Sequence, residues 1–565
     1  MSYLAVCRNP RAPEPAWLGA LARAVPPQWS VHAPAPGVLV ARAQGRRAAL
    51  IPQPWGVVIG ELFGGTMRGC ESAREQAAGL LDRAWGAYVA LICEPRSGEW
   101  SVLRDPSGAL DAVVWRRDGA VLIAGDLQGW LAPWLPADLA IDWSALAGLL
   151  ADPVRVSGRL ALSGLSGLAP GEFWSGGEAT LLWSPAKAAR REATPACEAM
   201  CALPDLVDEV VRAMAGERVL IELSGGLDSA IVASALRSVG KAPACALNYH
   251  TDDPGADERA YAQMVAERLG FQLTAASLGA PVLDLVGLAM QARGPRPPFN
   301  ALDQQHEADV SARCEALHID TLLTGQGGDH VFFQAPSALI AADGARHGPQ
   351  MLAVLSRRLG CSAWNIIGEA WKARFAAAPA RPMPAYLTRQ AWAEGLRGES
   401  HPWLLDLDGL APGKRLQAAS LAGALSLIGA SRRGEAAQLR HPLLSQPVME
   451  ACLRISVGDL TAGGHDRALA RAAFASRLPA AIIARQGKGR LTAHYGRAIA
   501  AGLRELSPLI LEGRLASQGL LDREVLARML SVEHLAWRGG FGAILSLAAV
   551  ELWVQAWEAR IGARS

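Results

Sequence analysis

A short run of glycine, serine and aspartate carries the clearest chemistry in this sequence. Residues 223–229 lie between a predicted buried strand, residues 219–223, and a predicted helix that starts at Ser229. Two glycines allow a tight turn that brings backbone N–H groups against a phosphate, and the hydroxyls and the helix N-terminus add donors. The carboxylate of Asp228 can hold a Mg²⁺ ion that neutralises departing pyrophosphate. The residues that we predict to form this phosphate-binding turn are Leu223, Ser224, Gly225, Gly226, Asp228 and Ser229.

The alternative interpretation of this run is a glycine-rich turn with fortuitous serines. It is disfavoured because the run has the strand–turn–helix setting that phosphate binding needs. The sequence contains no GxxxxGK[ST] run, so we do not expect transfer of the γ-phosphate by that route.

A second glycine-rich turn follows another predicted strand, residues 319–323, and ends at Asp329. Such a turn by itself is often a plain loop. At the carboxyl edge of a parallel sheet, however, two strand ends meet at one crevice. We therefore expect Asp329 to face Asp228 across a metal-bound pyrophosphate. Leu247 and Asn248, at the end of a predicted strand over 244–249, are candidates for the adenine pocket by position only.

The elements around these turns predict two kinds of architecture. Residues 38–124 contain short apolar runs separated by turn residues, which predicts packed β-strands, and further short runs reach Trp183. The basic and proline-bearing residues 184–195 are typical of a linker. We predict one domain over residues 1–190 and a second over residues 191–565.

Strands and helices alternate in the second domain. Predicted helices at 206–214 and 257–269 alternate with the strands already described, which indicates a doubly wound parallel sheet. Beyond Leu339 the sequence is rich in Ala, Leu and Arg and predicts mainly helices. The predicted fold class is therefore α/β, with a β-rich first domain and extra helices in the second.

The first glycine-rich run resembles the PP-loop of the adenylating ATPases, which cleave ATP between the α- and β-phosphates. That group includes asparagine synthetase, GMP synthetase, tRNA-modifying enzymes, β-lactam synthetase and the lasso peptide cyclases. The turn ending at Asp329 resembles the asparagine-synthetase signature of a glycine-rich turn before a Mg²⁺-binding aspartate. The resemblance implies that Gly325 contacts ATP and that ATP and Mg²⁺ are the cofactors. It covers most of residues 200–500 and is sparse between its motifs.

Residues 478–489 resemble the "LP..I..R.K" segment of the same family, in which the lysine lies by the reacting centre. This resemblance implies that Lys488 is catalytic, and a fixed ammonium suits a reaction that builds negative charge on acyl oxygen and phosphate. The alternative is a solvated surface lysine. Residues 441–444 resemble the family's "PFLD"-like segment, with Ser445 in place of the acid.

The first domain resembles the N-terminal, Ntn-type amidotransferase half of asparagine synthetase. Residues 104–108 and 122–126 carry this resemblance. That domain hydrolyses glutamine with a cysteine exposed once Met is removed, and the free α-amine serves as base for the thiol. Here the second residue is Ser2, a far poorer nucleophile, and Cys7 has no adjacent free amine and is expected within a strand. We therefore expect a degenerate glutaminase-like scaffold, and an amine that comes from elsewhere.

β-Lactam synthetase and the lasso peptide cyclases share this plan, and both join an amine and a carboxylate of one molecule. Asparagine synthetase has Glu, and β-lactam synthetase Tyr, where this sequence has Gln326. Gln cannot accept a proton, whereas a peptide α-amine with a pKa of about 7.7–8.0 needs little help from a base. This departure favours a lasso precursor peptide as substrate. His330 is either a proton acceptor or a polar loop residue.

The resemblance to lasso peptide cyclases also implies two protein partners, a leader-peptide-binding protein and a transglutaminase-like leader protease. The rival functions are an ammonia-dependent asparagine synthetase, a β-lactam-synthetase-like ligase and a non-catalytic nucleotide-binding scaffold. A tRNA-modifying ATPase is more remote, because added basic charge and a catalytic CxxC are both missing.

The totals fit a cytoplasmic enzyme without nucleic acid or membrane partners. The 55 basic and 53 acidic side chains give a net charge of +2, so no basic excess points to nucleic acid, although a local patch can hide in a balanced total. The nine cysteines are scattered, which is typical of a reducing compartment. The first residues do not resemble a signal peptide, and the apolar stretch 539–557 is interrupted by Glu551 and predicts a buried helix.

Overall fold

The computed structural model describes most of the chain. The described residues are 2–43, 49–65, 70–280, 282–334, 336–343, 348–375, 382–487, 489 and 492–564. Lys488 lies outside them.

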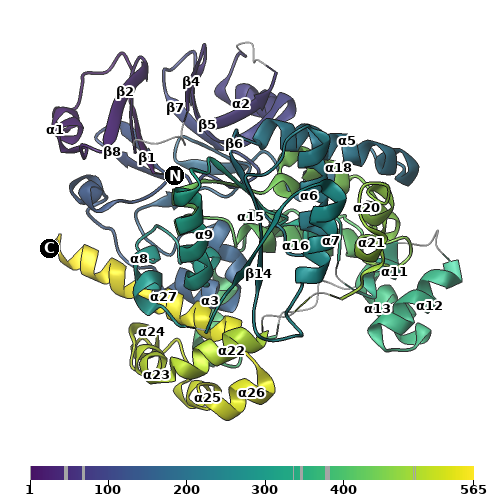
Figure 1. Cartoon of the computed structure of the whole chain (residues 1–565). Coiled ribbons are helices and arrows are strands. Elements are labelled where there is room, and N and C mark those ends of the chain that lie inside the picture. The colour runs from purple at the N-terminus through teal and green to yellow at the C-terminus, as the bar shows by residue number, and fades with distance from the viewer. Residues whose placement is uncertain are drawn as a thin grey trace.

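The N-terminal region contains two six-stranded antiparallel sheets, at the top of Figure 1. Their orders are β10-β8-β9-β1-β3-β2 and β12-β11-β7-β6-β5-β4. The strands are β1 (Tyr3–Cys7), β2 (Trp29–Ala35), β3 (Val38–Ala43), β4 (Leu50–Gln53), β5 (Gly56–Gly64), β6 (Ala84–Cys93), β7 (Trp100–Arg104), β8 (Val113–Arg117), β9 (Ala120–Ala124), β10 (Ser166–Gly167), β11 (Glu172–Ser175) and β12 (Glu178–Leu181). The helices of this region are α1 (Ala16–Ala24), α2 (Ala73–Arg83), α3 (Trp143–Ala151) and α4 (Pro185–Ala189).

Strand β1 shows why these sheets form a buried stack. All five of its residues are buried, and its side chains alternate between two apolar clusters. Tyr3 and Cys7 lie in the cluster between the two sheets, and Leu4 lies in the cluster on the outer face with α1 and α3. Since side chains of a strand point alternately to opposite faces, a continuous apolar run marks a strand covered on both sides. The predicted β-rich N-terminal region is confirmed.

The C-terminal region is built on a five-stranded parallel sheet of order β15-β14-β13-β16-β17. Its strands are β13 (Val219–Glu222), β14 (Cys245–His250), β15 (Leu273–Ser277), β16 (Thr321–Leu323) and β17 (Gln438–Arg440). The helices before β16 are α5 (Ala196–Met214), α6 (Leu227–Ser238), α7 (Arg259–Leu269), α8 (Leu285–Gln291) and α9 (Gln304–Ala316).

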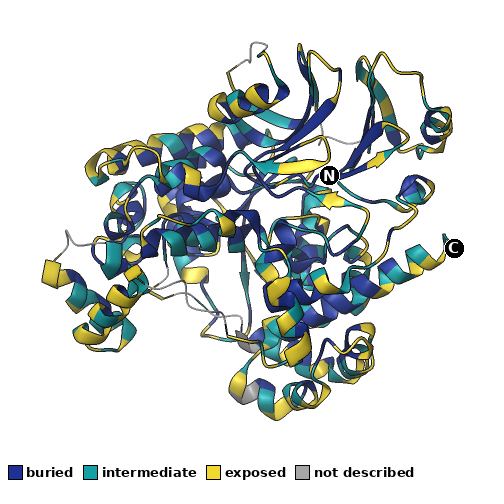
Figure 2. Cartoon of the chain, turned by 180° about the vertical axis from the view of Figure 1, so that it is seen from behind, coloured by how far each residue is buried: buried dark blue, intermediate teal, exposed yellow. Residues whose placement is uncertain are grey.

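Helices cover both faces of this sheet. In β13, Ile221 packs into the apolar cluster that holds α6 and α7, whereas Leu220 packs into the cluster that holds Val310 of α9. Burial on both faces requires near-continuous apolar strands, which is the pattern that the sequence showed. The predicted doubly wound parallel sheet is confirmed. All of β16 and all of β13 except Glu222 are buried, and Figure 2 shows exposed residues mainly on the outer helices.

Beyond β16 the described chain is almost entirely helical, as predicted. The helices are α10 (Gly328–Val331), α11 (Leu339–Asp343), α12 (Gly348–Leu359), α13 (Ala363–Phe375), α14 (Arg389–Arg397), α15 (Pro402–Leu405), α16 (Pro412–Leu425), α17 (Arg432–Ala436), α18 (Gln446–Leu453), α19 (Val457–Leu460), α20 (Ala468–Ala473), α21 (Ala480–Ala484), α22 (Thr492–Ala501), α23 (Leu503–Leu511), α24 (Arg514–Ser517), α25 (Arg523–Met529), α26 (Val532–Arg538) and α27 (Phe541–Gly562).

The apolar stretch near the C-terminus is a buried helix, as predicted. The carboxylate of Glu551 on α27 is buried and accepts hydrogen bonds from the backbone N–H groups of Arg514 and Leu515, at 2.7 and 2.9 Å. A carboxylate is stabilised there because it meets the unpaired N–H groups of the α24 N-terminus. In the described part of the chain, no helix combines the length and apolar character needed to cross a membrane.

The predicted linker at residues 184–195 is wrong in part. Residues 185–189 form helix α4, whose Ala186 and Ala188 are buried. Ser184 caps this helix through the N–H of Lys187, and Pro185 occupies the first turn, where a missing N–H has no cost. The serine and proline that resembled a linker are thus helix-start residues. One apolar cluster also spans both regions, so the domain boundary at residue 190 stays a prediction.

Candidate active site

The first glycine-rich loop lies at the carboxyl end of β13 and leads into α6, which begins at Leu227 rather than at Ser229. Gly225 has a φ of +80°, and a Cβ there would lie 2.9 Å from the carbonyl oxygen of Glu258. Only glycine fits this position. The Ser229 Oγ accepts the N–H of Ser224 at 3.2 Å and lies 3.1 Å from the Ser224 Oγ. The serines therefore hold the turn closed around the N-terminus of the helix.

The two glycine-rich turns are in direct contact, as the position of their strands predicts. A Cβ on Gly325 would lie 2.4 Å from the backbone nitrogen of Ser229. A Cβ on Gly328 would lie 2.6 Å from the Cγ of Asp228. The absence of side chains at both glycines is what lets the turns meet. Asp329 follows in the first turn of α10, its side chain is 47% exposed, and its carboxylate lies 3.6 Å from the His330 ring.

Asp228 is held by an arginine that the sequence interpretation missed. The Nη1 of Arg467 lies 2.7 Å from the Asp228 Oδ2, and its Nη2 lies 3.0 Å from Asp466. Arg467 has a φ of +50°, a strained conformation for a residue with a side chain. Asp466 is also paired with Arg471 and Arg358.

This network is charged and largely buried. Although burial raises the pKa of Asp466, Arg471 and Arg467 hold that pKa below its ordinary value. Asp466 therefore stays ionised and fixes Arg467 beside the first glycine-rich loop. No known motif marks these residues in the sequence, and the bond from Arg467 to Asp228 spans 239 positions.

The carboxylates at the carboxyl edge of the parallel sheet are suitable ligands for a Mg²⁺ ion that binds together with a nucleotide. Within the described residues, no three His, Cys, Asp or Glu side chains come together in a way that could hold a metal. Asp228 and Asp329 supply two carboxylates on touching turns, and Mg²⁺ is commonly bound by one or two carboxylates with phosphate and water oxygens. The loop's N–H groups and the N-terminus of α6 suit the phosphates.

The segment that contains Lys488 is anchored beside the first loop on both of its described sides. Arg485 forms an ion pair with Glu258, donates to the Gly225 carbonyl at 2.9 Å and stacks over Tyr261 at 3.9 Å. The N–H of Gly489 donates to the same Glu258 carboxylate at 2.6 Å. Lys488 itself lies outside the described residues, so its role stays a prediction.

Asn248 and Leu247 of β14 hold the start of the loop. The Asn248 Nδ2 donates to the Leu223 carbonyl at 2.8 Å, and the Leu223 N–H donates to the Leu247 carbonyl at 2.8 Å. Both side chains are buried. The contact on view is thus a structural one to Leu223, and an adenine contact stays a prediction.

Gln326 forms two hydrogen bonds, one through its backbone and one through its side chain. Its N–H donates to the Thr324 Oγ1 at 3.2 Å, and its side-chain amide donates to the Leu427 carbonyl at 3.3 Å. An amide that donates and cannot take a proton does not act as a base.

In the N-terminal region, the Ser2 hydroxyl contacts two polar side chains. Its Oγ lies 3.3 Å from both Asp126 and the Gln128 amide, and these two are 3.0 Å apart. Cys7 ends β1, is buried, and has its thiol pKa raised by that burial. The expectation that Cys7 lies within a strand is confirmed, and a buried thiol of raised pKa is unreactive.

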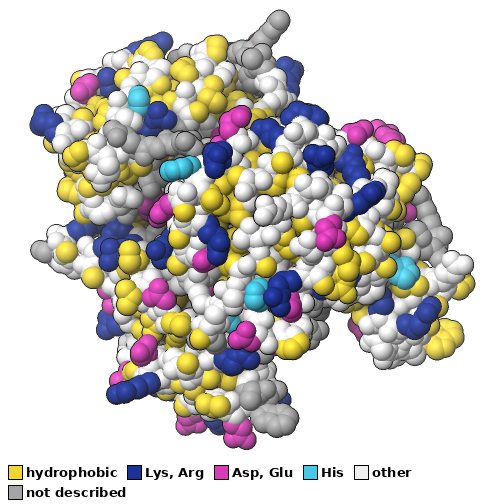
Figure 3. All heavy atoms as spheres, viewed as in Figure 1, with side chains coloured by type: hydrophobic (Ala, Val, Ile, Leu, Met, Phe, Trp, Pro, Cys, Tyr) yellow, Lys and Arg dark blue, Asp and Glu magenta, His cyan; other side chains and the backbone are white. Residues whose placement is uncertain are grey.

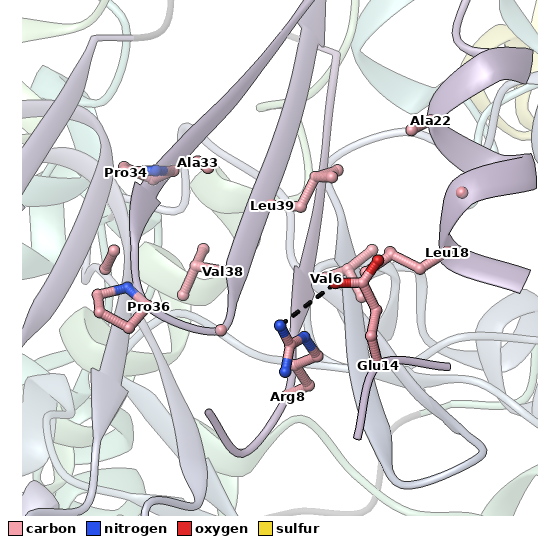
Figure 4. A pocket seen from close by; sticks show the side chains of 13 residues that line it. Val6, Arg8, Glu14, Leu18, Ala22, Ala33, Pro34, Pro36, Val38 and Leu39 are labelled. Atoms are coloured by element: carbon pink, nitrogen blue, oxygen red, sulfur yellow. Dashed lines mark hydrogen bonds and ion pairs between the residues drawn. The ribbon is translucent and has the colours of Figure 1, made fainter. Parts of the chain in front are cut away.

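Two cavities lie away from this edge. Figure 4 shows one of about 550 Å³, where side chains of α1 such as Leu18 face β2 and β3 across the ion pair of Arg8 and Glu14. Another, of about 750 Å³, lies between the two regions and includes Arg159 and Arg296 in its lining. Neither is lined by the glycine-rich turns. The face in Figure 3 carries acidic and basic side chains interspersed.

Comparison with known proteins identifies the family. The asparagine synthase family model matches residues 202–557, which include the parallel sheet and both glycine-rich turns. The chain therefore belongs to the asparagine synthase family and is an ATP-dependent ligase by that membership.

A relative of this chain is the microcin J25-processing protein McjC of Escherichia coli. It is 24% identical over 150 residues, which cover 26% of this chain and 28% of that protein. The match thus spans little more than a quarter of the relative. Among solved structures, the allosteric regulatory enzyme of purine biosynthesis aligns with 50% of this chain and 82% of its own, at 11% identity and a TM-score of 0.18, which is too low to support an inference.

Proposed function

We propose that this chain is a lasso peptide cyclase. A side-chain carboxylate of Asp or Glu in a linear precursor peptide attacks the α-phosphorus of ATP and releases pyrophosphate. The N-terminal amine of the same peptide then attacks the activated carbonyl, loses a proton and releases AMP. One amide bond forms, and the ring closes as a macrolactam. The observation that carries the proposal is the contact between the Asp228 loop and the Asp329 turn in an asparagine synthase family chain.

The proposed roles follow from where each group lies. Backbone N–H groups of the first loop and the hydroxyls of Ser224 and Ser229 bind the phosphates, at the positive end of α6. Asp228 and Asp329 would hold Mg²⁺, which would neutralise charge on the departing pyrophosphate. Arg467 beside Asp228 adds positive charge to the same place.

Lys488 is proposed to stabilise the acyl-transfer step. On one side of it the Arg485 side chain, and on the other the Gly489 backbone N–H, bind Glu258 next to the first loop. The proposed role of the ammonium is electrostatic, because negative charge builds on the acyl oxygen in both half-reactions.

The proposed nucleophile follows from the chemistry of Gln326. Its side-chain amide donates to the Leu427 carbonyl and cannot act as the base that a poorly nucleophilic amide or an ammonium would need. A peptide α-amine, with a pKa of about 7.7–8.0, is already partly neutral at pH 7. The partial match to McjC, named for processing microcin J25, favours the same substrate class. A leader-binding protein and a transglutaminase-like protease are the proposed partners.

The experiment is reconstitution with the precursor. The chain is co-expressed with a candidate lasso precursor peptide and a transglutaminase-like leader protease, and the peptide is examined by mass spectrometry. We expect a product one water lighter than the linear core, with an unreactive N-terminus and AMP in the reaction. Unchanged linear peptide, together with asparagine formation from aspartate, ATP and ammonia, would instead identify an ammonia-dependent asparagine synthetase. Binding of ATP with no pyrophosphate release for any acceptor would identify a nucleotide-binding scaffold.

A further inference from the structure

One short segment of the C-terminal region lies between the N-terminal sheets and the Asp329 turn. We call residues 440–446 the bridging segment. It starts at the last residue of β17, continues through a 3-10 turn, Pro442–Leu444, and ends at the first residue of α18. Strand β17 is an edge strand of three residues, so its own ladder gives this segment little support.

The bridging segment is held by the N-terminal region at both ends. Arg440 forms an ion pair with Glu61 of β5. The Gln446 Nε2 donates to the Leu81 carbonyl of α2 at 2.7 Å. The Arg440 and Glu61 side chains are only 12% and 24% exposed, so this is a pair partly withdrawn from water. Such pairs are geometrically demanding, because a partner that moves leaves the other charge buried.

Residues 440–444 of the segment contact both ends of the Asp329 turn. The Arg440 carbonyl accepts the Thr324 N–H at 3.2 Å, and the His441 Nδ1 lies 2.7 Å from the Thr324 Oγ1. At the other end, Leu444 fills the space beside Gly327, where a Cβ would lie 2.2 Å from the Leu444 Cγ. The bridging segment therefore contacts the Asp329 turn both before and after Gln326.

The His441 ring is neutral near pH 7, because burial, with the nearby Arg433, lowers its pKa to about 4. Its Nδ1 therefore pairs with the Thr324 hydroxyl without a buried charge, as acceptor or donor according to the tautomer. The Thr324 Oγ1 also accepts the Gln326 N–H at 3.2 Å.

We infer that the N-terminal region, which lacks the cysteine nucleophile, positions the Asp329 turn of the ligase site through the bridging segment. Glu61 acts through Arg440 and is a positioning residue. This inference rests on the proposed function only for the identity of the reaction, because the positioning itself concerns the turn that carries a proposed metal ligand. It explains why two antiparallel sheets remain packed on a region that supplies the chemistry.

The test uses Glu61→Ala in the full-length chain, with Glu399→Ala as its control. Glu399 also makes an ion pair between the regions, with Arg159 at 2.6 Å, but it is 75% exposed and does not touch the bridging segment. Affinity for Mg·ATP, kcat and KM for pyrophosphate release, and the melting temperature are measured for each variant. A misplacement of about 1 Å in a reacting group can cost on the order of 100-fold, so we expect kcat of Glu61→Ala to fall by roughly 10- to 100-fold.

Charge reversal separates positioning from general loss of stability. The double variant Glu61→Arg with Arg440→Glu restores an ion pair, and we expect it to recover most of the lost kcat. If Glu61→Ala does not fold, Gln446→Ala takes its place, because it removes the hydrogen bond to Leu81, together with one to Glu450 within α18. Wild-type kcat and Mg·ATP affinity in Glu61→Ala, or failure of the double variant to recover activity while it is folded, would overturn the inference. Altered Mg·ATP affinity in an enzyme that forms no macrolactam would sink the proposed function and leave this inference standing.

Discussion

Two places in this chain bring serine and carboxylate groups together near strand ends, and they differ in what surrounds them. Around Ser2, the hydroxyl, Asp126 and Gln128 satisfy one another at 3.0–3.3 Å. Around Asp228, glycines keep two turns in contact and a network of arginines adds charge. In the first arrangement the polar groups pair with one another, whereas in the second the loop leads into the N-terminus of α6. The comparison shows that serine and carboxylate side chains indicate a functional site only where the surrounding backbone can bind a ligand.

The sharpest way to break this comparison is to remove the proposed metal carboxylates. Asp228→Ala and Asp329→Ala should each lower pyrophosphate release by about 10³-fold or more, because metal charge stabilisation is worth several kcal/mol. Asp228→Asn, which keeps an acceptor for Arg467, tests the same point with less risk to folding. Near-normal turnover of either variant would remove that aspartate from the site.

Lys488→Ala should spare ATP binding and reduce ring closure. If the ammonium acts like an oxyanion donor, the loss is about 2.7–4 kcal/mol in the activation free energy. The measurement is the rate of macrolactam formation at saturating ATP. An unchanged rate with unchanged ATP affinity would place this side chain in solvent.

The buried histidine behind the Asp329 turn predicts a pH dependence of stability. His441 has a folded pKa of about 4, below an unfolded value of about 6.5, so the unfolded chain binds more protons between these values. The free energy of unfolding therefore has its full value above pH 6.5 and decreases as the pH falls toward 4. The decrease due to His441 is about 2 kcal/mol from pH 6.5 to 5.

Urea denaturation at the two pH values checks this prediction. His401, whose pKa burial lowers to about 3, contributes in the same direction. The relevant quantity is therefore the difference between the wild type and His441→Asn. Equal pH dependence of the two proteins would contradict the prediction.

The smallest effect is expected for substitutions of Ser2 in the N-terminal region. Ser2→Ala should change neither cyclisation nor ATP use, and glutamine should stimulate neither, because a serine hydroxyl lacks thiolate reactivity. Ser2→Cys should also create no glutaminase activity. Ammonia release from glutamine by the wild-type chain, above a control without enzyme, would make asparagine synthesis the leading interpretation.

Local patterns were enough to predict the parallel sheet and the meeting of its two glycine-rich turns. Apolar runs and glycines are read from neighbouring residues, and parallel strands end at one edge. The partners of these turns could not be predicted in the same way. Arg467 reaches Asp228 across 239 positions, and Arg485 reaches Glu258 across 227. No periodicity marks such pairs, and only the folded chain brings them together.

The central claim is that this chain activates a carboxylate by cleaving ATP at the α-phosphorus. Its most direct test is to identify the nucleotide product formed from ATP during turnover with the precursor peptide, in the wild type and in Asp228→Asn. The account predicts AMP and pyrophosphate in equal amounts with the amide formed, and neither product above background in Asp228→Asn. Formation of ADP and phosphate, or AMP formation that persists undiminished in Asp228→Asn, would contradict it.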